Sequence, residues 1–211
     1  MKLQSYLPTK FEVSGYIVKL KTAASFWMKF ATIQEKTPDT SNFMTYAVKS
    51  VRKNGVECGF EDLTPEILTK IYEKVFYFQT CGVEPEKYPQ AKKKQEKILD
   101  YNKDLPAIIA AFQQVYNINL LEIKEDKYLI DTMHWWHFSA LLNNLPSGNQ
   151  LKDFYMYYRS VDIKDMPNKT DYDKKQRAHI IKMKEIVSLN PKKQTQPEES
   201  EFLKRSRRLN G

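Results

Sequence analysis

The chain has 211 residues, 41% of them apolar and 13% aromatic, and a formal net charge of +8. This length can bury a sizeable core without disulfides, and Cys58 and Cys81 have neither a close partner nor metal-ligand spacing. No stretch approaches the roughly 18 apolar residues of a membrane helix, and the N-terminus lacks the apolar segment of a secretory signal. We therefore expect a soluble protein that is not exported.

The positive charge is concentrated in two segments with few large apolar residues. Lys and Arg outnumber Asp and Glu by five to three in Glu84–Lys97 and by six to three in Asn190–Gly211, which leaves +3 for the remainder. A nucleic-acid-binding domain usually carries its basic residues on the folded surface. The location of the charge therefore argues against nucleic acid as the main partner.

The first half predicts a β-hairpin followed by helices. Apolar residues alternate on both sides of Ser14-Gly15, which indicates the hairpin. Helical spacing of apolar residues follows Thr22, and a weaker helix is expected over Ser41–Arg52. The clearest helix begins after the cap residue Thr64 and ends at Gly82.

The second half predicts helices after a charged linker. Residues 84–97 contain two prolines and a lysine run, which is typical of a solvated tether, with a phosphate-binding patch at Lys92–Lys94 as the alternative. Helical patterns follow over 104–116, 126–146, 147–163 and 171–189. The fold class is therefore mainly α with an N-terminal β-hairpin. The expected divisions are an N-terminal domain at 1–83, the linker at 84–97, a C-terminal helical domain at 98–190 and a disordered tail at 191–211.

The sequence MHWWHF, Met133 to Phe138, allows three interpretations: a metal site, a base-stacking platform or a packed helix. His134 and His137 lack the third and fourth ligands that zinc requires, and stacking platforms need a basic groove beside exposed aromatics. Spacing of 100° per residue makes the predicted helix apolar almost all round. Such a helix is either central to its domain or shared between a core and a partner surface. His137 falls on the main apolar arc, which predicts a half-buried, hydrogen-bonded side chain.

Catalytic motifs are missing from the sequence. It contains no P-loop, dinucleotide-binding turn, Gly-x-Ser-x-Gly elbow or His-Glu-x-x-His pair, and six glycines leave little material for phosphate loops. Asp162, Asp165 and Asp171 are loosely spread, as in a solvated loop. We expect a non-enzymatic protein without cofactor or metal.

The run Tyr157, Tyr158 and Arg159 has two interpretations of equal weight. Exposed Tyr and Arg are frequent anchors of protein interfaces, which makes these three residues candidates for partner binding. The alternative is a core tyrosine beside a surface arginine.

Three segments resemble the gene-product-fifteen family of long-tailed phages and prophages of Gram-positive bacteria. They are AAFQQVYNINL (Ala110–Leu120), MHWWHFSALLNNLP (Met133–Pro146) and MYYRSVDI (Met156–Ile163). The N-terminal half resembles the family more loosely, through Trp27, Phe30, Phe76, Phe78, Cys81-Gly82 and the lysine-rich tether. The family usually has Gly-Ile-Asp-Leu at the position of Asn117–Leu120, and often Lys or Arg in place of His137. Asn117 still tolerates a left-handed turn.

The resemblance implies a tail-assembly role, because genes of this family typically precede the tape-measure gene, where tail-assembly chaperones are encoded. The implied partners are the phage tape-measure protein and, as further candidates, the tail-tube protein and a second copy of the chain. The implied location is the cytoplasm of the bacterial host. No membrane partner is implied, and the charge distribution given above argues against nucleic acid as a partner.

A helper for a long helical protein needs an apolar groove that accepts amphipathic helices. We hypothesise that Trp135, Phe138, Leu142 and Leu145, with Tyr157 and Tyr158, line this groove. A flexible tether would let one half bind tube subunits while the other holds the tape measure. The alternatives are a structural tail or connector component retained in the virion, and a nucleic-acid-binding regulator acting through Lys92–Lys94 and Lys204–Arg208.

Overall fold

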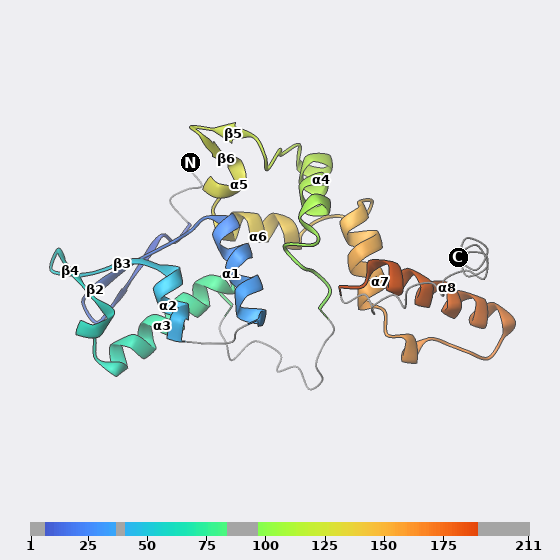
Figure 1. The fold of residues 1–211 in the computed structure, drawn as a ribbon, viewed down its shortest axis with the longest axis horizontal. Helices are drawn as coiled ribbons and strands as arrows, with labels where there is room; N and C mark the ends of the chain where they lie inside the picture. The colour runs from blue at the N-terminus through green and yellow to red at the C-terminus, as the bar shows by residue number, and fades with distance from the viewer. Residues whose placement is uncertain (1–6, 37–40, 84–96, 190–211) are drawn as a thin grey trace, which may run out of the picture.

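The computed structural model describes residues 7–36, 41–83 and 97–189 (Figure 1). These residues confirm the predicted class: the chain is mainly α-helical, with an antiparallel β-sheet near its N-terminus. No described helix is both long enough and apolar enough to cross a membrane. The predicted tail and nearly all of the predicted linker lie outside the described residues.

The N-terminal sheet has four strands in the order β1-β2-β3-β4. Their bounds are β1 Lys10–Val13, β2 Tyr16–Leu20, β3 Val48–Lys53 and β4 Val56–Cys58. Each hairpin turns through two residues with positive φ, Ser14-Gly15 (49° and 81°) and Asn54-Gly55 (50° and 82°). Paired left-handed residues match the twist of the strands they join. The first hairpin was predicted correctly.

The helix predicted over Ser41–Arg52 is wrong in its second half. Helix α2 covers Ser41–Ala47, and the chain then continues as strand β3, which pairs with β2 and β4. The Asn54-Gly55 turn brings Val51 opposite Cys58, so sheet pairing replaces helix continuation. Asn-Gly between apolar runs is a strong hairpin signal that the helical interpretation overlooked.

Two helices of the N-terminal half contact each other through aromatic rings, and the second of them also contacts strand β1. Helix α1 covers Ala24–Lys36 and α3 covers Pro65–Gln79, preceded by the short 3-10 helix η2 at Phe60–Asp62. Thr64 and Pro65 take the predicted first positions of α3, but the Thr64 side chain makes no capping hydrogen bond. The Trp27 ring of α1 lies 5.2 Å from the Phe78 ring of α3 and is almost fully buried. These aromatic contacts form the centre of the N-terminal half.

The helix predicted over residues 126–146 is interrupted. Helix α4 (Leu105–Tyr116) is followed by the strands β5 (Ile123–Lys124) and β6 (Lys127–Tyr128) and by helices α5 (Leu129–Thr132) and α6 (Trp135–Asn143). Between α5 and α6, Met133 is extended and its carbonyl accepts the Ala24 N–H at 2.8 Å. The Trp135 N–H in turn donates to the Thr22 carbonyl at 2.7 Å. Pairing with the segment before α1 therefore breaks the helix.

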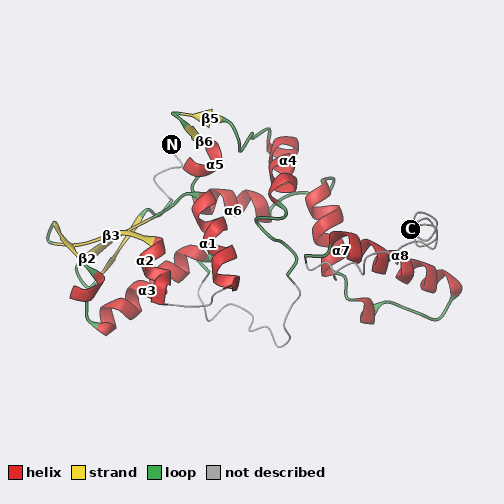
Figure 2. Cartoon of the chain, viewed as in Figure 1, coloured by secondary structure: helices red, strands yellow, loops and turns green. Residues whose placement is uncertain are grey.

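The C-terminal part forms a helical arm that extends away from the sheet (Figures 1 and 2). Its elements are the π-helix η4 (Leu151–Met156), α7 (Tyr157–Ser160), the 3-10 helix η5 (Ile163–Asp165) and α8 (Asp171–Val187). Thr170 and Asp173 form a capping box at the start of α8, which confirms the predicted position of the last helix.

One cluster of buried residues joins the two halves. It runs from Val13 in the sheet to Leu151 in the arm and includes Trp27 of α1 and Trp135 of α6. The described residues on both sides of the predicted linker thus share a hydrophobic core. The division into separate domains stays a prediction.

A buried ion pair attaches the arm. Arg159 donates to both carboxylate oxygens of Asp104, Nη1 to Oδ2 at 2.5 Å and Nη2 to Oδ1 at 2.9 Å, and the two side chains are 7% and 2% exposed. The same guanidinium donates to the carbonyls of Val187 and Ile98. One side chain thereby connects α7, the start of α4 and the end of α8.

Removing one member of this pair should destabilise the protein strongly. Arg159→Ala leaves a buried carboxylate without its cation, and we expect a loss of about 3–5 kcal/mol in the free energy of unfolding. Urea denaturation measures this value. The control is Arg52→Ala, because the Arg52–Glu57 pair is 3.5 Å long and 48% and 63% exposed. The control should lose about 1 kcal/mol or less, and equal losses would contradict the assignment.

Candidate functional site

The MHWWHF motif forms the start of α6. His134 is the N-cap residue, and its Nδ1 accepts the Trp136 backbone N–H at 3.1 Å. Its Nε2 lies 2.9 Å from the Pro8 carbonyl oxygen. Because Nδ1 accepts, the neutral ring carries its proton on Nε2 and donates to Pro8. His137 is exposed, so its predicted half-buried role is wrong and belongs to His134.

The two indoles of the motif complete the C-terminal end of α3. Trp135 Nε1 donates to the Gln79 carbonyl at 2.9 Å, and Trp136 Nε1 donates to the Phe78 carbonyl at 2.8 Å. The last carbonyls of a helix have no partner within it. The indoles supply donors for two of them and fix α6 against the end of α3.

The predicted groove of α6 is wrong, because its residues face the core. The four side chains are almost fully buried: Trp135 6%, Phe138 0%, Leu142 6% and Leu145 2%. Trp135 lies 6.5 Å from the Trp27 ring of α1, and Phe138 stacks 5.1 Å from the Phe112 ring of α4. Aromatic side chains of α1 and α4 cover this face, which leaves at most 6% of any of the four side chains exposed.

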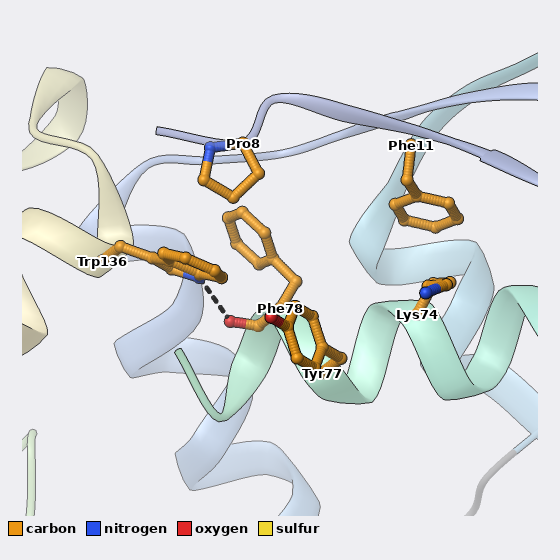
Figure 3. A pocket seen from close by; sticks show the side chains of 6 residues that line it. All are labelled: Pro8, Phe11, Lys74, Tyr77, Phe78 and Trp136. Atoms are coloured by element: carbon orange, nitrogen blue, oxygen red, sulfur yellow. Dashed lines mark hydrogen bonds between the residues drawn. The ribbon is translucent and has the colours of Figure 1, made fainter. Parts of the chain in front are cut away.

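An aromatic pocket lies instead beside Trp136 (Figure 3). It has a volume of about 300 Å³ and is lined by Pro8, Phe11, Lys74, Tyr77, Phe78 and Trp136. The half-buried Trp136 ring lies 6.1 Å from the Tyr77 ring and 5.8 Å from the Phe78 ring. We call this set of six residues the Trp136 pocket. Its walls come from the N-terminal segment, α3 and α6.

The walls of the Trp136 pocket are mostly apolar. The carbonyls of Phe78 and Pro8 are already bonded to Trp136 and His134. Lys74 supplies the one charge among the lining residues, with its Nζ 5.8 Å from the centre of the Tyr77 ring. The pocket can therefore accept an apolar group beside a cation.

A second hollow, of about 540 Å³, has Trp27, Cys81 and Trp135 among its lining residues. Burial raises the pKa of the Cys81 thiol, and a hydrogen bond with Ser139 partly offsets the shift. The thiol is therefore largely protonated at neutral pH, which makes it a poor nucleophile. Among the described residues, no group of three His, Cys, Asp or Glu side chains is placed to hold a metal ion.

The remaining predicted site residues lie on the arm, away from the sheet (Figure 1). Tyr157 is 51% exposed, whereas Tyr158 packs between Phe154 and His179. Arg159 belongs to the buried ion pair, so its predicted role as an interface residue is wrong. Of these three, only Tyr157 presents a large open surface.

One family model matches most of the chain. The family model described as "Bacteriophage Gp15 protein" matches residues 4–189. The chain belongs to this family. Neither a curated protein nor a solved structure matches the chain. The family assignment agrees with the resemblance found in the sequence and makes this a phage-associated protein.

Sequence reasoning missed most of the pocket of this Gp15-family protein. Lys74, Tyr77 and Phe78 lie within one turn of α3, and this spacing could have revealed a shared surface. Pro8 and Phe11 gave no such signal, because only the packing of β1 beside α3 brings them there. The sequence predicts that Trp136 lies on a helix that is apolar almost all round, and this pattern does not show that its ring faces the surface.

The two tryptophans should differ in their effect on stability. Trp135→Ala empties a buried core position and should lower the free energy of unfolding by about 3–5 kcal/mol. Trp136→Ala removes a half-buried ring and one hydrogen bond, for which we expect about 1–2 kcal/mol. Chemical denaturation of both variants measures the difference. Equal losses would show that Trp136 is a core residue and that the pocket is not a separate surface.

Acidification should weaken the fold through His134. Burial lowers the pKa of this imidazole, the hydrogen bond to Pro8 opposes the shift, and the charge of His137 adds to the lowering. The folded pKa therefore lies below the unfolded value of about 6.5, so the unfolded chain binds the proton first. The neutral His134 ring therefore contributes its full stability above a pH of about 6.5, and this stability is lost as the pH falls from there through the folded pKa.

The measurement is the urea midpoint between pH 8 and pH 5. His134→Asn keeps an N-cap acceptor without a titrating ring and should flatten the curve. His137→Asn, at an exposed position, is the matched control and should retain most of the slope. Identical slopes for the wild type and His134→Asn would contradict the assignment.

Proposed function

We propose that this protein is a non-enzymatic phage tail-assembly chaperone that binds the tape-measure protein and helps the tail tube assemble around it. Membership of the Gp15 family supports a phage role. The family resemblance supplies the more specific expectation, because its genes typically precede the tape-measure gene.

The Trp136 pocket is the observation that carries the proposal. It is an apolar hollow that includes Trp136 of the MHWWHF motif, and the carbonyls of Phe78 and Pro8 in its walls are already paired. Amphipathic helices bind such surfaces through apolar anchors. A long helical partner exposes many such anchors before it is assembled.

The proposed activity requires no nucleotide. A protein that binds the unassembled partner lowers the concentration of its free, aggregation-prone form by mass action. The described fold suits this task, because one continuous core supports the pocket while the arm carries the exposed Tyr157 as a second candidate contact.

Co-expression with the tape-measure protein encoded beside this chain tests the proposal. We expect the wild type to keep the tape measure soluble and to co-purify with it, and Trp136→Ala to reduce the soluble fraction severalfold. Tyr172→Ala is the control, because Tyr172 is 69% exposed on α8 and does not line the pocket. The soluble fraction with Tyr157→Ala shows whether the arm also contributes to binding.

An insoluble tape measure with no complex would contradict the chaperone role. The main alternative, a structural tail or connector component, predicts a fixed number of copies in purified virions, whereas a chaperone should be absent from them. Mass spectrometry of purified particles distinguishes the two. The nucleic-acid alternative relies on residues 92–94 and 204–208, which lie outside the described residues.

A further inference from the structure

The Trp136 pocket has the size of a site for one large side chain. A volume of about 300 Å³ lies at the lower end of the range for small-molecule sites. Aromatic rings from α3 and α6 form its floor, and Pro8 and Phe11 lie across from them (Figure 3). An aliphatic or aromatic side chain can bury its surface here without leaving the carbonyls of Phe78 or Pro8 unpaired.

Lys74 adds a charge preference to the pocket. It is exposed and forms no ion pair with any described residue, whereas Lys70, one turn earlier on α3, pairs with Glu66 at 2.6 Å. Glu12 on β1 is exposed but follows Phe11, and adjacent strand residues point to opposite faces. The rim of the pocket is therefore positive.

The distances limit how the apolar group and its acidic partner can be spaced. The Tyr77 ring lies between the two ends of the pocket, 6.1 Å from the Trp136 ring and 5.8 Å from Lys74 Nζ. A ligand that packs on Trp136 and reaches Lys74 therefore spans at most about 12 Å. Residues four or seven positions apart on one face of a helix are separated by about 6 Å and 10 Å along its axis. Both spacings fit.

We propose that the pocket binds an amphipathic helix that inserts one large apolar side chain against Trp136 and places Asp or Glu four or seven residues away, on Lys74. The inference rests on the proposed function in taking the tape-measure protein as the source of this helix. The binding mode itself follows from the shape and charge of the pocket. Segments without an acidic residue at either spacing bind more weakly.

The test uses overlapping 20-residue peptides of the tape-measure protein and the full-length chain. Trp136 is half-buried, whereas Trp27 and Trp135 are buried, so changes in tryptophan fluorescence report occupation of the pocket. We expect the tightest peptides to carry the apolar and acidic pair. Lys74→Glu should weaken them about fivefold or more, because attraction becomes repulsion. Replacing the acidic residue of the peptide by Lys should restore binding to this variant.

Two controls are needed. One shows whether the effect of Lys74→Glu comes from the pocket or from the overall charge of α3, and the other shows whether the bound peptide is helical. Lys70→Glu changes the same charge one turn away, at a residue that does not line the pocket, and should have little effect. A proline in the middle of the peptide should abolish binding, because it breaks the helix. Equal binding by Lys74→Glu, an equal loss with Lys70→Glu, or unchanged binding of the proline peptide would overturn the proposal.

The result also separates this inference from the proposed function. If the wild type solubilises the tape measure and neither Trp136→Ala nor Lys74→Glu changes this, the chaperone role stands and the pocket inference fails. If no tape-measure peptide binds and the co-expressed tape measure stays insoluble, the proposed function fails. A designed alanine-rich helix with one Phe, and Glu four residues later, then decides the pocket inference: binding that Lys74→Glu weakens supports it, and no binding overturns it.

Discussion

The hydrogen bonds from two adjacent indoles to the end of α3 determine how the halves of this protein meet. Trp135 and Trp136 donate to successive carbonyls at the end of α3, those of Gln79 and Phe78, and the Phe78 carbonyl also accepts the Cys81 N–H. Each bond contributes about 1 kcal/mol, and the buried rings contribute more. Because the indoles point to one helix end, the orientation of α6 is fixed. Trp135 enters the core, and Trp136 is left as the wall of a surface pocket.

Local signals predicted the elements whose ends are set by neighbouring residues. The Ser14-Gly15 turn, the Thr64-Pro65 start of α3 and the left-handed Asn117 after α4 all lie where the sequence indicated. Such features depend on backbone conformation and on contacts within a few residues. The same reasoning applied to Asn54-Gly55 would have identified the second hairpin, so that error came from neglecting a turn signal.

Long-range contacts explain the errors that no local signal could prevent. A helix that is apolar almost all round does not reveal which side faces the core, and α1 and α4 decide this for α6. Arg159 follows two tyrosines and resembles an interface anchor, yet Asp104 meets it from 55 residues earlier in the chain. His134 rather than His137 is held because Pro8, 126 residues earlier in the chain, supplies the acceptor.

The pocket and the core are built by the same residues, which relates stability to the proposed binding. Phe78 packs on Trp27 inside the protein and, through its ring and carbonyl, also contacts Trp136 at the surface. The pocket is therefore held in shape before any partner arrives, which lowers the entropy cost of binding. A single site of this size gives modest affinity, which would suit the proposed chaperone role, in which the partner has to be released. Under the proposed function, stable retention of a long partner requires several copies of the chain, each holding one helical segment. Binding of one copy assists binding of the next only when all of them bind the same partner molecule.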